Sequence, residues 1–85
     1  MSKAKTMMQG IDLTLPLVNP FTLTSAMHAL GQANVPVDGL CVVPEQQILH
    51  LAVGQELGRV ARRALEVAGL AVLKERTVII IEMII

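Results

Sequence analysis

Residues 35–53 read VPVDGLCVVPEQQILHLAV, and this stretch decides the fold. Residues 35–43 alternate and are rich in β-branched side chains, with a break at Gly39, which is typical of a strand. Residues 44–47 form a turn, and residues 48–53 form a second strand. Because the connection is short, the two strands are expected to pair as an antiparallel hairpin. Pro36 has no backbone N–H to donate, so the first of these strands is predicted to lie at a sheet edge.

A strand and a helix precede the hairpin. Ile11, Leu13 and Leu15 alternate with polar residues, which predicts a half-buried strand that ends near Leu17. Residues 18–20 form a loop. The helix that follows has no clear capping residue, since either Asn19 or Thr22 could serve. Its apolar stripe at three-four spacing is Leu23, Ala26, Met27, Leu30 and Ala33.

A second helix and a last strand follow the hairpin. The apolar stripe of this helix is Leu57, Val60, Ala61, Ala64, Leu65 and Ala68, and its water-facing residues are Arg59, Arg62, Arg63 and Glu66. Gly69 comes just after the helix, where a left-handed residue is favoured. The last strand is predicted over residues 70–81, with a bend at 74–76.

The order of these elements is βαββαβ. It predicts an α+β, ferredoxin-like fold, a split βαβ with a four-stranded antiparallel sheet and both helices on one face. The first and third strands are then central, and the second and fourth are edges. Residues 1–85 form a single domain. Residues 1–9 precede the first predicted strand, and they are either flexible or, through Met7 and Met8, laid against a neighbouring subunit.

Composition predicts an oligomer. Apolar residues make up 53% of the chain, and Phe21 is the single aromatic residue. So much apolar surface on a small domain favours a subunit interface, most simply that of a homodimer. The subunits could join edge to edge or face to face. Seven basic and seven acidic residues balance, which argues against a nucleic-acid partner and against a polybasic membrane anchor.

Several features predict a cytoplasmic protein. The single cysteine, Cys41, cannot form an internal disulfide, which suits a reducing compartment. Residues 1–5 carry two charges with no long apolar run behind them, so no signal peptide is expected. The apolar segment 78–85 contains Glu82 and is far shorter than the roughly 20 residues that a bilayer span needs.

Motifs for catalysis are absent from the sequence. It contains no Gly-rich phosphate loop, no Cys-x-x-Cys and no His-Glu-x-x-His, so we expect neither an enzyme nor a cofactor. If the hairpin turns symmetrically, Cys41 and His50 lie opposite each other. The pair could bind a metal, or His50 could make Cys41 a reactive thiol, but an inert, packed cysteine is far more common. No metal site is therefore expected.

The layout resembles the ACT domain, a small regulatory module that binds amino acids. Three segments carry the resemblance: residues 20–23 (PFTL), residues 30–39 (LGQANVPVDG), and residues 49–53 (LHLAV) with 61–70 (ARRALEVAGL). They are similar to the family's loop after the first strand, to its first-helix end with second strand, and to ACT domains of short, stand-alone type. The resemblance covers residues 11–82.

The resemblance implies a ligand site between subunits, in which the first loop faces a neighbour's second strand. Its candidate residues here are Val18, Asn19, Pro20, Phe21, Thr22 and Leu23 from one subunit, and Val37, Asp38, Gly39 and Leu40 from another. The family's loop glycine is Phe21 in this chain. The family's two asparagines are Val18 and Pro36, and Asn19 and Asp38 are the nearest polar substitutes.

Two functions are consistent with these residues. The first is a regulatory module that binds a small amino acid at the interface of a homo-oligomer and acts on a protein partner. The alternative is an assembly module without a small ligand, its pocket plugged by Phe21. Phe21 could also form a lid over the pocket. Without the resemblance, the loop would be an ordinary connection with Phe21 packed in the core.

Overall fold

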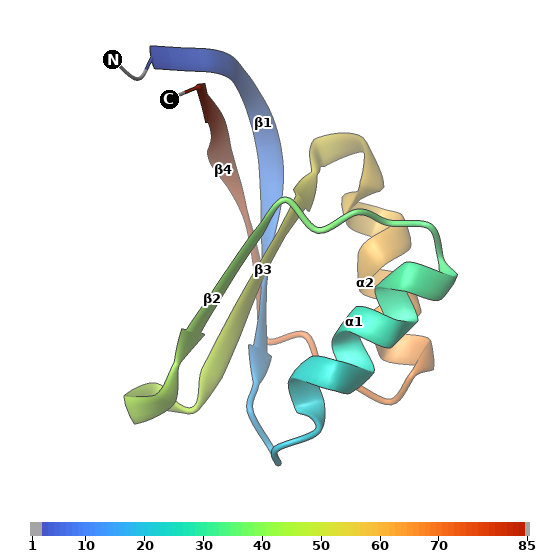
Figure 1. The fold of residues 1–85 in the computed structure, drawn as a ribbon. Coiled ribbons are helices and arrows are strands. Elements are labelled where there is room, and N and C mark those ends of the chain that lie inside the picture. The colour runs from blue at the N-terminus through green and yellow to red at the C-terminus, as the bar shows by residue number, and fades with distance from the viewer. Residues whose placement is uncertain (1–2, 85) are drawn as a thin grey trace.

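Four strands and two helices make up the computed structural model, which describes residues 3–84. The elements in chain order are β1 (Lys3–Pro16), α1 (Thr22–Gln32), β2 (Gly39–Val43), a 3₁₀ turn (Pro44–Gln46), β3 (Ile48–Gly54), a second 3₁₀ turn (Gln55–Leu57), α2 (Gly58–Val67) and β4 (Lys74–Ile84). The sheet order is β2-β3-β1-β4, all neighbours are antiparallel, and both helices cover one face (Figure 1). The predicted fold class is confirmed, with β1 and β3 central.

Alternation along the central strands separates the two faces of the sheet. Leu13 and Leu15 of β1 and Leu49, Leu51 and Val53 of β3 are buried on the face that packs against the helices. Each strand turns its intervening residues to the other face, opposite the two helices (Figure 1). We call this second face the open face. The buried hydrophobic core is Leu13, Leu15, Ala26, Leu30, Val35, Leu49, Leu51, Val53, Ala61 and Leu65.

The predicted boundaries of the strands differ from the observed ones. β1 begins at Lys3 rather than Ile11, so the predicted start of this strand is wrong and residues 3–9 belong to it. Residues 1–2 of the predicted N-terminal segment lie outside the described residues. This part of β1 pairs with the C-terminal part of β4, and the two strands extend together beyond the helices (Figure 1). Met7 lies in this extended part of β1 and is 66% exposed.

The edge strands are also shorter at their starts than predicted. β2 starts at Gly39 instead of Val35, because the segment before it contains Pro36 and begins with Asn34 in the left-handed region, at φ 59°. β2 is an edge strand, as predicted. β4 starts at Lys74 instead of Leu70.

The helices bury narrower stripes than predicted. In α1, Ala26 and Leu30 are buried together with Thr22, while Met27 is 40% exposed. In α2, Ala61 and Leu65 are buried, while Val60 is 48% exposed. Both helices are short and lie on a small sheet, so the outer flank of each stripe remains uncovered.

Both helices end in the same backbone motif. In α1 the N–H of Asn34 donates to the Gly31 carbonyl and the N–H of Val35 donates to the Leu30 carbonyl. In α2 the N–H groups of Gly69 and Leu70 make the equivalent pair of bonds. This pattern places its left-handed residue directly after the C-cap, and Gly69 occupies that position at φ 85°, as predicted.

Arg62 ties α2 to β4. Its Nη1 donates to Glu75 Oε1 at 3.0 Å and its Nε donates to Glu66 Oε2 at 3.3 Å. These side-chain hydrogen bonds raise the pKa of the Arg62 guanidinium above its ordinary value, and the bond to Glu75 has the larger effect. Across residues 3–84, no helix has the length and apolar character needed to cross a membrane.

Candidate functional site

The predicted site loop connects β1 to α1 through a network that Asn19 organises. The N–H of Phe21 donates to Asn19 Oδ1 at 2.8 Å, and the N–H of Asn19 donates to Thr22 Oγ1 at 3.3 Å. The N–H of Thr22 in turn donates to the Asn19 carbonyl at 3.2 Å. Asn19 and Thr22, the two capping candidates, therefore act together on the turn before the helix.

The first turn of α1 still has unpaired donors. Phe21 occupies the N-cap position, and no side chain within the described part of the chain makes a capping hydrogen bond. The first helical bond is made by the N–H of Ser25 to the Phe21 carbonyl. Within residues 3–84 the N–H groups of Leu23 and Thr24 have no carbonyl partner, as is usual for a first turn. Donors in this position attract an anionic group such as a carboxylate.

A hollow borders this turn of α1. Its volume is about 230 Å³. Two segments face each other across it, the β1–α1 loop and the loop that leads from α2 into β4. The lining residues are Leu15, Pro16, Val18, Asn19, Thr22, Ser25, Gly69, Leu70 and Ala71. The hollow thus combines an aliphatic wall with the polar start of a helix.

Phe21 lies outside this hollow. Its side chain is 71% exposed and does not line the cavity. The interpretation in which Phe21 packs in the core is therefore wrong. Phe21 does not fill this hollow in its own chain, and a pocket between subunits that is plugged by Phe21 stays a prediction. Val18 beside it is 75% exposed, so the loop presents two apolar side chains outward.

The other predicted half of the site lies away from the loop. Gly39 pairs with Ala52, whereas Val43, at the far end of β2, pairs with Ile48, which also pairs with Pro16 beside the loop. The start of β2 is therefore about 13 Å along the strand from the loop end, at roughly 3.3 Å per residue. Residues 37–40 do not meet residues 18–23 within one chain.

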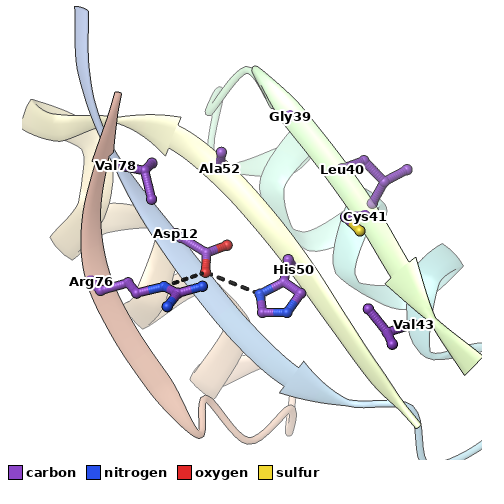
Figure 2. A pocket seen from close by; sticks show the side chains of 9 residues that line it. All are labelled: Asp12, Gly39, Leu40, Cys41, Val43, His50, Ala52, Arg76 and Val78. Atoms are coloured by element: carbon purple, nitrogen blue, oxygen red, sulfur yellow. Dashed lines mark hydrogen bonds and ion pairs between the residues drawn. The ribbon is translucent and has the colours of Figure 1, made fainter. Parts of the chain in front are cut away.

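Residues 37–40 have their own local structure. Val37 packs against the core, and the N–H of Asp38 donates to the Ala52 carbonyl at 2.8 Å. Gly39 and Leu40 line a different hollow, which lies on the open face (Figure 2).

Cys41 also lies at this second hollow, opposite His50 (Figure 2). The predicted pairing of these two residues is confirmed. Cys41 is exposed, however, so the prediction that it is a packed, buried cysteine is wrong. Among the described residues no group of three or more His, Cys, Asp or Glu side chains could hold a metal ion.

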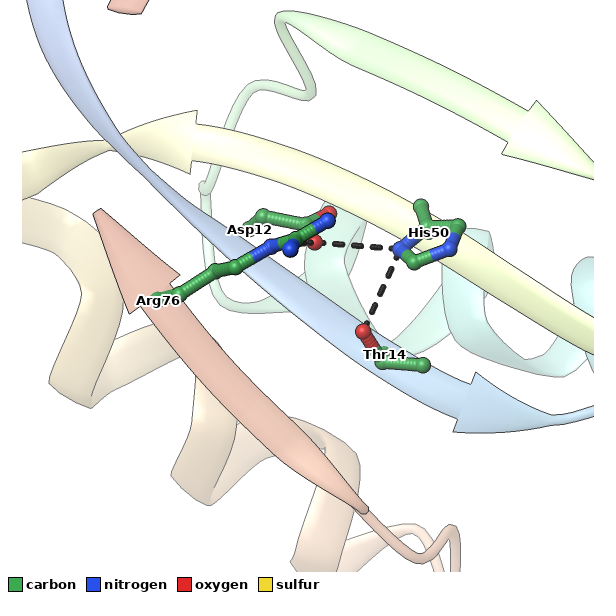
Figure 3. Close-up of polar contacts among 4 residues, drawn as sticks. All are labelled: Asp12, Thr14, His50 and Arg76. Atoms are coloured by element: carbon green, nitrogen blue, oxygen red, sulfur yellow. Dashed lines mark hydrogen bonds and ion pairs between the residues drawn. The ribbon is translucent and has the colours of Figure 1, made fainter. Parts of the chain in front are cut away.

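A polar cluster occupies the middle of the open face (Figure 3). Asp12 Oδ2 lies 3.0 Å from His50 Nδ1 and 3.5 Å from Arg76 Nε. Thr14 Oγ1 lies 3.2 Å from the same His50 nitrogen. Asp12 and Thr14 are each 6% exposed, although they lie on the face opposite both described helices. Their neighbours on the adjoining strands shield them.

The contacts of His50 define its tautomer. A carboxylate can only accept, so Nδ1 carries a proton and donates to Asp12. The Thr14 hydroxyl then accepts from the same N–H. Nε2 has no hydrogen-bond partner within residues 3–84, and the ring is held in place from one side only.

Sequence reasoning missed three members of this cluster: Asp12, Thr14 and Arg76. Asp12 and Thr14 are the polar residues that alternate with Ile11, Leu13 and Leu15 in the strand that the sequence predicts to be half-buried. Their position in a strand predicted to be central was the available signal, because polar residues there are flanked on both sides.

The chain is similar to known proteins in structure but not in sequence. No protein-family model matches the sequence, and no curated protein matches it by sequence. The regulatory subunit of aspartate kinase from Thermus flavus superposes with a TM-score of 0.61 at 18% identity, over 92% of this chain and 54% of that chain. The chain has an ACT-like fold.

A second ACT-like neighbour agrees. The ligand-free regulatory subunit of aspartate kinase from Thermus thermophilus superposes with a TM-score of 0.60 at 16% identity, over 89% of this chain and 53% of that chain. The chain spans about half the length of these two regulatory subunits. The resemblance drawn from the sequence is therefore confirmed in its fold.

Proposed function

We propose that this ACT-like chain is a regulatory module that binds a small amino acid, or a related carboxylate, between copies of itself. The observation that carries the proposal is the hollow of about 230 Å³ at the start of α1. It borders the first turn of α1 through Thr22 and Ser25. In the same turn, the N–H groups of Leu23 and Thr24 have no carbonyl partner within residues 3–84. The likeness in fold to two regulatory subunits of aspartate kinase supports a regulatory role over a catalytic one.

The chemistry of the hollow favours a particular kind of ligand. The two N–H groups would receive the carboxylate. Leu15, Leu70 and Ala71 would contact an aliphatic side chain. The Ser25 hydroxyl and the side chain of Asn19 line the same hollow and would face the ligand's amino end. A hollow of this size suits a small apolar amino acid better than an aromatic one.

A second copy would close the site. Residues 37–40 of that copy would face the loop, as the sequence resemblance implies. Val18 and Phe21 on the loop and Leu40 on β2 are all more than half exposed, which supports a contact between copies at these points. A ligand that touches two subunits favours the state in which both are correctly placed, and this linkage would report its occupancy to a protein partner in the cytoplasm.

Thermal unfolding of the protein in the presence of each common amino acid, followed by circular dichroism, tests the proposal. At ten times its Kd a ligand stabilises the folded state by about 1.4 kcal/mol. In a domain of this size, that is a rise in Tm of about 5–10 °C. One amino acid or a small group of them is expected to give such a rise.

Two variants on α1 localise the ligand. Ser25→Phe introduces a ring into the hollow, whereas Met27→Phe adds a similar ring at an exposed position outside it. Ser25→Phe should lose the rise in Tm and Met27→Phe should keep it. A flat profile for the natural sequence, with a rise restored by Phe21→Gly, would instead support the assembly module in which Phe21 of a neighbouring copy fills the site.

A further inference from the structure

The open face of the sheet contains two adjoining hollows that meet at His50 and Arg76. One, of about 430 Å³, lies between β2 and β4 over Ala52 (Figure 2). The other, of about 380 Å³, lies toward the start of β4 over Thr14. Both volumes fall in the range of small-molecule sites. Because His50 and Arg76 line both hollows, the two are direct neighbours, and we call them together the groove.

The two ends of this groove differ in character. The first hollow is lined largely by aliphatic side chains, among them Leu40, Val43 and Val78. The second contains two cations, Lys74 and Arg76, and the hydroxyl of Thr14. The groove therefore has an aliphatic end and a cationic end.

The charge of the groove is not balanced internally. Among the described residues that line it, Asp12 is the single acidic one. Oδ2 of Asp12 already contacts both His50 and Arg76. Arg76 makes that contact through Nε and remains 67% exposed, and within residues 3–84 no ion pair involves Lys74. One positive charge thus remains without a partner in the described part of the chain.

We propose that the open face binds an organic carboxylate with an aliphatic body. The carboxylate would lie between Lys74 and Arg76, where Thr14 and the amide of Gln46 can add hydrogen bonds. The aliphatic body would lie along Ala52, Val78 and Leu40. This site is separate from the hollow at α1, which lies at the end of the helix layer, and it does not depend on that proposal.

Other ligand classes fit the groove less well. The ammonium group of an amino acid would be repelled by the two cations at the polar end. Inorganic phosphate would leave the aliphatic hollow empty. An uncharged lipid-like molecule would leave the excess positive charge unpaired.

Titration with octanoate, followed by amide chemical shifts of the ¹⁵N-labelled full chain, tests the proposal. Octanol, acetate and inorganic phosphate serve as matched probes. Octanoate is expected to shift the amides of Cys41, His50 and Arg76 in a saturable way and to bind at least tenfold more tightly than each of the other three. Shifts confined to residues 18–25, equal binding of octanol, or no saturable shift would overturn it.

Charge-removing variants provide the second arm of the test. Lys74→Gln and Arg76→Gln should each weaken octanoate binding about tenfold. Arg59→Gln removes a charge from the exposed face of α2, outside both hollows, and should leave binding unchanged. Because Arg76 also contacts Asp12, Lys74→Gln decides the outcome if Arg76→Gln disturbs the fold. Undiminished binding by Lys74→Gln would contradict the assignment.

Discussion

Asp12 on β1 and His50 on β3 are joined diagonally across the sheet. The register pairs Asp12 with Ala52 and His50 with Thr14, yet Asp12 Oδ2 lies 3.0 Å from His50 Nδ1. Arg76, which lies directly opposite Asp12 on β4, contacts the same carboxylate oxygen. One buried aspartate thus connects three neighbouring strands on the open face.

This connection predicts energetic coupling between Asp12 and His50. Both side chains are mostly shielded from water, at 9% and 23% exposed. A double-mutant cycle with Asp12→Ala and His50→Ala, measured by urea unfolding, should give a coupling of about 1 kcal/mol. The same cycle on the exposed pair Arg62 and Glu66 should give a much smaller value, because water screens that pair. Additive effects for Asp12 and His50 would show that the contact does not persist in solution.

Replacing Gly10 by alanine is predicted to destabilise the folded protein. A Cβ at this position would lie 2.8 Å from the carbonyl oxygen of Val53, which is backbone and cannot move aside. Gly10→Ala should therefore lower the free energy of unfolding by about 1–3 kcal/mol. Gly31→Ala is the matched control, since a Cβ there meets no atom within 4 Å. Within a helix this change should raise stability by about 0.5–1 kcal/mol. Equal effects of the two changes would be inconsistent with the packing described.

Replacing Gly69 by alanine is predicted to destabilise the protein for a different reason. A Cβ there also meets no atom within 4 Å, but the residue is at φ 85°. Gly69→Ala should cost about 1–2 kcal/mol of unfolding free energy through backbone strain alone. Asn34→Gly, at the equivalent position after α1, should be neutral or slightly stabilising. A neutral Gly69→Ala would mean that the helix end adopts another conformation.

The Cys41 thiol is predicted to react with alkylating reagents in the folded protein. Its side chain is exposed on the open face, beside His50. Iodoacetamide should modify it in the folded protein without denaturant, as mass spectrometry would detect. If octanoate occupies the adjacent groove, it should slow this modification, whereas acetate should not. If the thiol reacts only after unfolding, Cys41 is packed, as the sequence suggested, and its exposure in the structure is contradicted.

The fold was predictable because its signals are local. Alternation of Ile11, Leu13 and Leu15 marks β1, and three-four spacing marks both helices. The pairing of Cys41 with His50 was also predictable, since a short turn fixes the register of the strands that it joins. These inferences need only residues that are near one another in the chain.

The remainder depends on residues far apart in sequence. Residues 3–9 become strand because β4 is long enough to pair with them, which no pattern within residues 3–9 reveals. The cluster of Asp12, His50 and Arg76 requires the register of three strands at once. The exposure of Phe21 depends on how Asn19 turns the loop, through hydrogen bonds that composition does not encode.

Sedimentation equilibrium at micromolar protein, with and without the amino acid that raises Tm most, tests the central claim most directly. Binding between copies predicts a mass at least twice the 9.1 kDa of the chain, and association that strengthens when the ligand is added. A mass of one chain at all concentrations, unchanged by a ligand that nevertheless binds, would contradict a site shared between subunits.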